Sequence, residues 1–291
     1  MTLSNSFSAF VNGELLPAAE ARISAFDEGF TLGLSVYETL LSERGFVYFV
    51  EDHVERLRES VQALGVAWPL PWDVVEALQL MARSVPDRDV ALRITLSRGV
   101  RGCGPTLVVA ARELSHPTEG GVCLALSDRA KLGAAPLEGV KTTNRLRNVL
   151  ALEEAQALGA WEALLPTEEG DFSEGTVSNL FAVVGGRLLT PPLGRGCLPG
   201  IMRQKVLDVA RAEPLRAGDS VLAVETARLE RSTLEAADEL FLTNTTGRVI
   251  PVRTVLGTEK IYPGSQGALA IELRRRIGIL EASYRQARDP D

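Results

Sequence analysis

The stretch Gly139–Asn144 (Gly-Val-Lys-Thr-Thr-Asn) places Lys141 between an expected strand and an expected helix. A second stretch, Ser173–Phe181 (Ser-Glu-Gly-Thr-Val-Ser-Asn-Leu-Phe), carries Glu174, and a third, Leu198–Arg203 (Leu-Pro-Gly-Ile-Met-Arg), opens a helix. A primary amine, a carboxylate and a glycine-led helix N-terminus are the groups that a pyridoxal phosphate site requires. The amine forms the Schiff base, the acid keeps the pyridine nitrogen protonated, and the backbone amides bind the phosphate.

Each of these signals is weak alone. A lysine after a strand is usually a solvated surface charge, and a Pro-Gly pair before a helix is common in ordinary turns. Glu174 could be a turn carboxylate, but the apolar run Leu180–Val184 that follows it indicates a sheet-lined cavity. A buried acid needs a partner, and a protonated pyridine nitrogen would be a suitable one. Thr245 and Thr246 follow an expected strand and offer hydroxyls, although in isolation they are typical of a plain turn.

Composition limits the class of protein. The chain has 291 residues, of which 45% are hydrophobic and 24% charged, so it can form a sizeable core in one large or two modest domains. The net charge of -7 disfavours a nucleic-acid or anionic-membrane partner but leaves room for a local basic pocket. The three cysteines are odd in number and widely spaced, and there are two histidines, so neither a disulfide framework nor a metal site is expected.

The N-terminus lacks a basic region followed by an apolar one, and no apolar run approaches the roughly 20 residues that span a bilayer. We therefore expect a soluble, cytoplasmic protein.

Hydrophobic periodicity predicts an α+β chain with two α/β sub-domains. The turn-rich segment Glu113–Gly121 suggests a linker at 116–121 between a small domain, 1–115, and a large domain, 122–291, that carries the lysine. The expected strands are hairpins around Asn12-Gly13, Glu43–Gly45 and Gly185-Gly186, and runs at Val90–Leu96, Thr106–Ala111, Val122–Leu126 and Glu239–Thr243. The expected helices begin near Asp52 and cover about Trp72–Arg83, Asn144–Leu158, Ile201–Ala212 and Gly267–Ile279.

His53 and Arg56 are three residues apart on the first expected helix, off its apolar Val54-Leu57-Val61 face. Two interpretations are open. The pair could belong to a surface ion-pair helix, or Arg56 could fork onto a phosphate with His53 orienting it.

The glycine-rich segment Ser97–Pro105 also has two interpretations. It could be a flexible hairpin tip, or a loop whose Arg98 and Arg101 grip a substrate carboxylate with two parallel hydrogen bonds. Its glycine spacing does not fit a dinucleotide fingerprint, and no helix follows it.

Taken together, the chain resembles the class IV (fold-type IV) pyridoxal phosphate enzymes. This family includes branched-chain aminotransferases, D-amino-acid aminotransferases and 4-amino-4-deoxychorismate lyases. The resemblance covers nearly the whole chain, and its order and spacing make it specific. The segments that carry it are Phe10–Gly13, Asp27–Gly33, Val36–Leu40, Glu51–Leu57, Lys141 with Asn144 and Asn148–Ala151, Glu174-Gly175 with Ser178-Asn179, and Leu198–Arg203.

The resemblance implies a D-amino-acid aminotransferase-like fold with the active site between two domains, bound pyridoxal 5'-phosphate, and a homodimer in which a loop reaches in from the neighbour. Lys141 would be the Schiff-base lysine and proton shuttle, and Glu174 would pair with the pyridine nitrogen. Arg56, Thr245 and the amides of Ile201 and Met202 would hold the phosphate. Aminotransferases of the family often have threonine where this chain has Met202, which offers only its backbone amide.

The substrate loops favour one member of the family. Branched-chain enzymes tend to show a Tyr-x-Arg-Pro strand, and D-amino-acid enzymes an Arg-x-His motif; neither is present at Leu92–Leu96 or after Arg101. The lyases tend to show a basic residue, then Ser-Arg-Gly, then Arg-Gly, which Arg93, Ser97–Gly99 and Arg101-Gly102 resemble. Tyr37, Arg93, Arg101 and Thr246 would contact the substrate. We therefore expect a lyase that releases p-aminobenzoate and pyruvate, and keep as the alternative an aminotransferase for a D-amino acid, an (R)-amine or a branched-chain amino acid.

Overall fold

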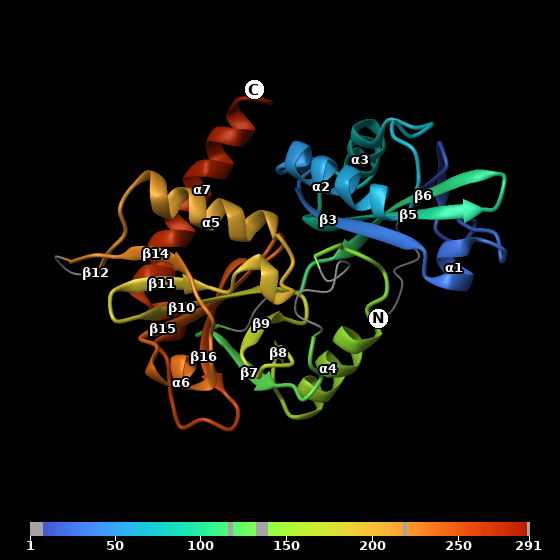
Figure 1. Ribbon diagram of the computed structural model, residues 1–291. Coiled ribbons are helices and arrows are strands. Elements are labelled where there is room, and N and C mark those ends of the chain that lie inside the picture. The colour runs from blue at the N-terminus through green and yellow to red at the C-terminus, as the bar shows by residue number, and fades with distance from the viewer. Residues whose placement is uncertain (1–7, 116–118, 132–138, 218–219, 290–291) are drawn as a thin grey trace. The chain divides into compact units, whose positions relative to one another are not determined.

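The computed structural model describes residues 8–115, 119–131, 139–217 and 220–289. Backbone contacts divide the chain into two compact units (Figure 1). The first comprises Met1–Ser115, Val140–Asn144 and Tyr284–Asp291, and the second comprises His116–Gly139 and Arg145–Ser283. The lysine segment thus groups with the first unit, whereas the sequence assigned it to a domain over 122–291. The expected linker at 116–121 includes residues 116–118, which lie outside the described residues.

The first unit is built on an antiparallel sheet with the strand order β2-β1-β6-β5-β3-β4. Helices α2 and α3 lie on one face of this sheet (Figure 1). The strands are β1 (Ser8–Val11), β2 (Glu14–Pro17), β3 (Ser35–Glu43), β4 (Phe46–Val47), β5 (Val90–Val100) and β6 (Gly104–Glu113). The helices are α1 (Glu28–Leu32), α2 (Val50–Ala63) and α3 (Val74–Arg83).

Local chemistry explains these elements. Asn12 and Gly13 adopt positive φ angles of 49° and 104°, as the tight turn between β1 and β2 requires. The Asp73 side chain caps α3 by accepting hydrogen bonds from the amides of Val75 and Glu76 at 2.8 and 3.1 Å. Apolar side chains of α2, α3 and the sheet form one core, in which Leu57 is buried.

The second unit is built on a mixed sheet with the order β14-β11-β10-β15-β16-β7-β8-β9. Its strands are β7 (Val122–Leu126), β8 (Glu162–Pro166), β9 (Phe172–Gly175), β10 (Asn179–Val184), β11 (Arg187–Thr190), β14 (Ala223–Thr226), β15 (Glu239–Asn244) and β16 (Arg248–Val255); β12 (Arg216–Ala217) and β13 (Ser220–Val221) form a separate pair. The helices are α4 (Leu146–Ala157), α5 (Ile201–Ala212), α6 (Arg231–Ala236) and α7 (Ala268–Gln286), with short 3-10 turns at Leu193–Arg195 and Gly264–Gln266.

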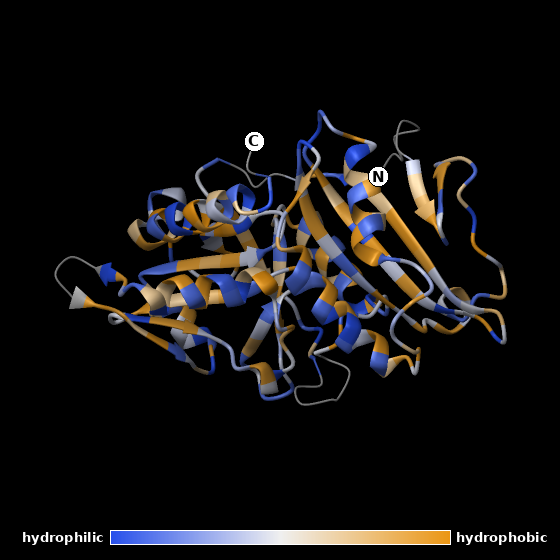
Figure 2. Ribbon diagram, turned by 90° about the horizontal axis from the view of Figure 1, so that it is seen from above, coloured by the Kyte–Doolittle hydropathy of each residue, from blue (hydrophilic) through white to orange (hydrophobic). Residues whose placement is uncertain are grey.

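The parallel strands β7 and β8 are joined by a long crossover that contains α4. Before α4 the chain passes through Val140–Asn144, which pairs with β3 of the first unit. In the middle of the large sheet, Phe181 of β10 and Phe241 of β15 stack with ring centroids 5.0 Å apart. Apolar colouring runs along the strands, while the helices show both apolar and polar residues (Figure 2).

The structure confirms the predicted hairpins around Asn12-Gly13, Glu43–Gly45 and Gly185-Gly186 and each predicted helix, with α7 extending beyond the expected end at Ile279 to Gln286. Several strands were not predicted, namely β8, β9, β14 and β16. None of the helices in the described ranges is long and apolar enough to cross a membrane.

Candidate active site

Lys141 extends the sheet of the first unit at the edge of β3. Its carbonyl oxygen accepts a hydrogen bond from the amide of Tyr37 at 2.9 Å, and Thr142 forms an antiparallel bridge with Val36. The amide of Thr143 donates to the carbonyl of Ser35 at 3.0 Å. Three consecutive residues are therefore held by β3, which fixes the backbone of a lysine that lies in no helix or strand of its own.

The Tyr37 ring brings three of the predicted site residues together. The Lys141 ammonium nitrogen lies 4.6 Å from the ring centroid, and the Arg93 guanidinium carbon lies 3.7 Å from it. Strand register explains the second contact, because Tyr37 pairs with Thr95 and Arg93 is two residues along on the same face of β5. Two cations on one buried aromatic ring give this face a positive potential that suits an anionic ligand.

The next residue of β3, Glu38, points to the opposite face and meets α2. Its carboxylate accepts two hydrogen bonds from Arg56, Nε to Oε1 and Nη2 to Oε2, and a third from His53 Nδ1 to Oε2, all at 2.7 Å. Burial alone would raise the pKa of Glu38, but the charge and hydrogen bonds of Arg56, together with His53, lower it to about 2.

His53 and Arg56 are buried, so the interpretation of this segment as a surface ion-pair helix is wrong. Burial lowers the pKa of His53, so the neutral ring donates from Nδ1 to Glu38, and its Nε2 atom has no hydrogen-bond partner among the described residues. Arg56 forks onto a carboxylate of the chain itself. Its expected role toward a phosphate stays a prediction.

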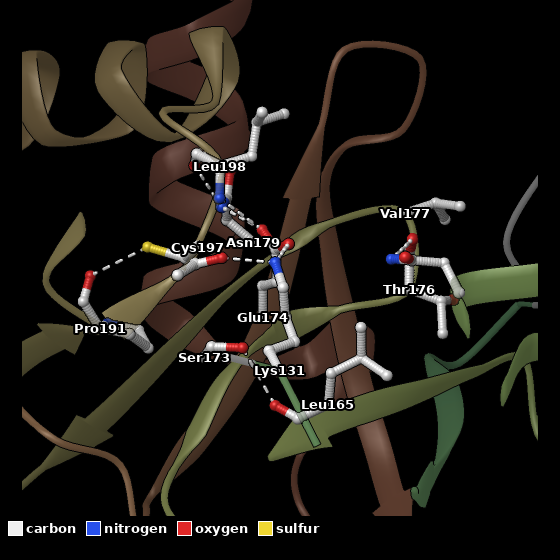
Figure 3. A network of polar contacts seen from close by, with 12 residues as sticks. Lys131, Leu165, Ser173, Glu174, Thr176, Val177, Asn179, Pro191, Cys197 and Leu198 are labelled. Atoms are coloured by element: carbon white, nitrogen blue, oxygen red, sulfur yellow. Dashed lines mark hydrogen bonds and ion pairs between the residues drawn. The ribbon is translucent and has the colours of Figure 1, made fainter. Parts of the chain in front are cut away.

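In the second unit, Glu174 lies on the edge strand β9, with its carboxylate buried among donors (Figure 3). Oε1 accepts from the Lys131 ammonium at 2.6 Å. Oε2 accepts from the backbone amide of Leu198 at 2.8 Å and from Asn179 Nδ2 at 3.3 Å. Asn179 also donates to the carbonyl of Leu198 at 2.9 Å, so the acid is tied to the segment that leads into α5.

The start of α5 offers backbone amides for an anion. Gly200 is the N-cap residue, and no side chain caps the helix, so the amides of Ile201 and Met202 have no partner within it. A Cβ atom at Gly200 would come within 1.9 Å of Asn179 Oδ1, so only glycine fits this close approach. The Met202 side chain is buried in the core, which leaves its amide as its polar group at this end.

Thr245 and Thr246 lie in the turn after β15, at the sheet end where Asn179 of β10 pairs with Thr243. The Thr246 hydroxyl interacts with Asn244 Oδ1 at 3.3 Å. The buried Thr243 hydroxyl has no hydrogen-bond partner among the described residues. The strand ends thus bring the acid, the helix N-terminus and this turn to one end of the second unit.

Arg101 does not join the group around Tyr37 within one chain. It lies in the exposed turn between β5 and β6, eight residues beyond Arg93, which corresponds to a separation on the order of 20 Å along a strand. Arg98 is also at the surface, where it pairs with Glu28 at 3.4 Å.

Two residues in these clusters were missed by the sequence reasoning. Glu38 could have been found, because it shares its strand face with the apolar Val36 and Leu40, and a charge at a core position needs a partner. Lys131 carries no comparable signal, since it follows no periodic pattern and its partner is 43 residues away.

These groups fit pyridoxal phosphate. The first unit supplies a lysine amine beside an aromatic ring. The second supplies a buried carboxylate next to a glycine-led helix N-terminus, whose first amides have no partner within the helix. A two-sheet fold of this kind with such donors is that of a pyridoxal phosphate enzyme.

Comparison with known proteins gives the family. The family model for amino-transferase class IV matches residues 35–255, and the chain belongs to this family. A proposed branched-chain-amino-acid aminotransferase of Methanocaldococcus jannaschii is 31% identical over 85% of this chain and 88% of its own. The aminodeoxychorismate lyase of Bacillus subtilis is 27% identical over 90% of each chain.

A solved branched-chain amino acid aminotransferase from T.th., in complex with N-(5'-phosphopyridoxyl)-L-glutamate, is 26% identical with a TM-score of 0.82 over 96% of both chains. The protein is therefore a pyridoxal phosphate enzyme of fold type IV, as the sequence predicted. The relatives include both lyases and aminotransferases, so the family leaves the reaction open.

Proposed function

We propose that the protein is a 4-amino-4-deoxychorismate lyase, which releases p-aminobenzoate and pyruvate. The observation that carries this proposal is the position of Arg93 on the Tyr37 ring that Lys141 also contacts. The substrate has one carboxylate on its ring and another on its enolpyruvyl group, so a guanidinium close to the reactive amine suits it. The similarity to the Bacillus subtilis lyase supports the same choice.

The chain's residues would divide the work as follows. Lys141 would hold the cofactor and accept the proton from the ring carbon that bears the amino group. The enolpyruvyl oxygen then leaves and takes up a proton, so the ring becomes aromatic and pyruvate is released. Bound pyridoxal phosphate supplies the electron sink for this step. Arg93 would bind a substrate carboxylate, and Tyr37 would hold the Arg93 and Lys141 side chains in place.

The cofactor would be held mainly at its two ends. Glu174 would keep the pyridine nitrogen protonated, while the amides of Ile201 and Met202 and the Thr245 hydroxyl would bind the phosphate. Arg56, oriented by Glu38, would add a guanidinium to the phosphate site. Arg101 and Thr246 would complete the substrate site, Arg101 from the neighbouring subunit of the predicted homodimer.

An aminotransferase is the second candidate, and the 31% identity to the Methanocaldococcus jannaschii protein favours it. In that reaction Lys141 would move a proton from the substrate α-carbon to the cofactor, and the amino group would pass to a 2-oxo acid.

A paired assay separates the two candidates. Purified protein loaded with pyridoxal phosphate is given aminodeoxychorismate, and p-aminobenzoate and pyruvate are followed. The same sample is given D-alanine, L-leucine or an (R)-amine with 2-oxoglutarate or pyruvate. Aromatic release with poor amino transfer supports the lyase; efficient transfer without aromatic product shows an aminotransferase.

Variants then test the proposed carboxylate site. Arg93→Ala should lower kcat/KM for aminodeoxychorismate by tenfold to a few hundredfold, as expected for a lost charged hydrogen bond of about 1.5–3 kcal/mol, while the cofactor still binds. Arg101→Ala should also damage turnover with the cofactor retained. Arg112→Ala, an exposed arginine on β6, is the control and should be neutral. Full lyase activity in both Arg93→Ala and Arg101→Ala would reject the assignment.

A further inference from the structure

Lys131 is a buried ammonium outside the predicted site. Its side chain is 5% exposed, and it follows β7 at a point where it forms a parallel bridge with Thr167. Lysine is seldom buried, and removing its charge from water is costly unless strong partners replace the solvent. Here the ammonium donates to Glu174 Oε1 at 2.6 Å and to the carbonyl oxygen of Gly196. A lysine held in this way serves the groups that it contacts.

The donors around Glu174 are divided unequally between its two oxygens. Among the described residues, Oε2 receives the Leu198 amide and Asn179 Nδ2, whereas Oε1 receives Lys131 (Figure 3). An ionised carboxylate has about four lone-pair sites, two on each oxygen. The arrangement therefore fills Oε2 and leaves an acceptor site on Oε1, next to the ammonium.

The second contact of Lys131 reaches the other end of the cofactor site. Gly196 lies at the end of the 3-10 turn Leu193–Arg195, and the chain continues from it through Leu198 to the first amides of α5. One ammonium thus connects the carboxylate on β9 to the segment that positions the phosphate-binding amides.

We propose that Lys131 is a positioning residue that holds Glu174 ionised, directs Oε1 toward the pyridine nitrogen of the cofactor, and fixes the Gly196–Leu198 segment before α5. The inference rests on the proposed role of Glu174, and it applies equally to a lyase and to an aminotransferase. Because the ammonium and the protonated pyridine nitrogen share one carboxylate, Lys131 also limits how strongly Glu174 raises the proton affinity of the cofactor.

The charge-sharing argument gives a direction that can be measured. In Lys131→Met a positive charge close to the cofactor is lost, so protonation of the bound cofactor becomes easier. The pH midpoint of its visible absorbance should rise by on the order of one pH unit. Lys131→Arg keeps the charge and should keep the midpoint. A purely structural role would weaken the fold without this difference between the two variants.

Cofactor affinity is the second readout, measured by titrating the apoprotein with pyridoxal phosphate and following tryptophan fluorescence. Lys131→Met should raise the Kd by roughly tenfold to a hundredfold, the equivalent of one lost hydrogen bond to a charged group. Lys260→Met replaces a half-buried lysine of the same unit and should leave the Kd and the absorbance midpoint unchanged.

Glu174→Gln distinguishes failure of this inference from failure of the proposed role of Glu174. If Glu174→Gln leaves the absorbance midpoint and Kd as in the wild type, Glu174 is not the partner of the pyridine nitrogen and both proposals fail. If Glu174→Gln changes them but Lys131→Met does not, the role of Lys131 alone is rejected.

The double variant Lys131→Met/Glu174→Gln guards against misfolding, because it removes both buried charges together. We expect the Lys131 substitution to have little further effect on the midpoint in the Glu174→Gln background, since its influence passes through that carboxylate. Independent, additive effects of the two substitutions would overturn the inference.

Discussion

Replacing Glu38 by glutamine should destabilise the protein in a pH-dependent way. The Glu38 carboxylate is 1% exposed and accepts three hydrogen bonds of 2.7 Å from Arg56 and His53. Against burial, which acts to raise it, these partners lower the pKa of Glu38 from 4.5 to about 2. At about 1.4 kcal/mol per pKa unit, this difference corresponds to about 3 kcal/mol of folding free energy near neutral pH.

The sign follows from the direction of the pKa. The folded protein holds the Glu38 proton less tightly than the unfolded chain does, so this stabilisation is fully present above about pH 4.5 and is lost as the pH falls toward 2. Glu38→Gln lacks it at every pH and leaves the charge of Arg56 buried without a carboxylate, for which breaking a buried pair costs about 3–5 kcal/mol. The deficit should be about 3–5 kcal/mol at pH 7 and shrink as the pH falls below about 4.5.

Urea unfolding at pH 7, 5 and 3, followed by circular dichroism and tryptophan fluorescence, measures this difference. Trp68 and Trp72 pack against the core of the first unit and report on it directly. The control is Glu55→Gln on the same helix, which removes an exposed ion pair with Arg58 and should cost at most about 0.5 kcal/mol. A Glu38→Gln deficit below about 1 kcal/mol at pH 7, or one equally large at pH 3, would refute the reasoning.

Two further predictions concern the second unit. Glu162 is fully buried, and burial raises its pKa from 4.5 to about 7, so ionisation costs stability as the pH rises through 4.5 to 7. Glu162→Gln should therefore be near neutral at pH 5 and stabilising by up to about 3 kcal/mol at pH 8.5 in urea unfolding, and a difference independent of pH would contradict this. Gly200→Ala places a Cβ 1.9 Å from Asn179 Oδ1 and should raise the Kd for pyridoxal phosphate by about tenfold, whereas Gly194→Ala, with open space around its Cβ, should leave it unchanged. Equal Kd values for the two variants would show that the close approach does not matter.

Local signals predicted a large part of the fold. The turns at Asn12-Gly13 and Gly185-Gly186 need positive φ angles, and residues suited to them stand between apolar runs, so both hairpins could be predicted. Helix α5 follows Pro-Gly and has the expected bounds, Ile201–Ala212. In contrast, β8 is a buried run of five residues whose partner β7 lies across a long crossover, and its length and periodicity give no decisive signal.

The site was predictable where strand register or order along the chain carries it, and not where burial decides. Tyr37 and Arg93 are brought together by the β3–β5 register. His53 and Arg56 were placed on a solvent face because the apolar stripe of α2 runs beside them, but a buried acid on β3 draws both inward. The 43-residue separation between Lys131 and Glu174 has no counterpart in any local pattern.

The three buried glutamates show why only one of them suits a pyridine nitrogen. Glu38 is already saturated by Arg56 and His53, so a further cation would compete with a guanidinium fork. Glu162 has a pKa raised to about 7 by burial, so it is substantially protonated near neutrality and holds a pyridinium weakly. Glu174 is ion-paired with Lys131 through one contact of Oε1 and keeps an acceptor site there. The lysine thus keeps the carboxylate charged in a buried site without occupying the position that the cofactor needs.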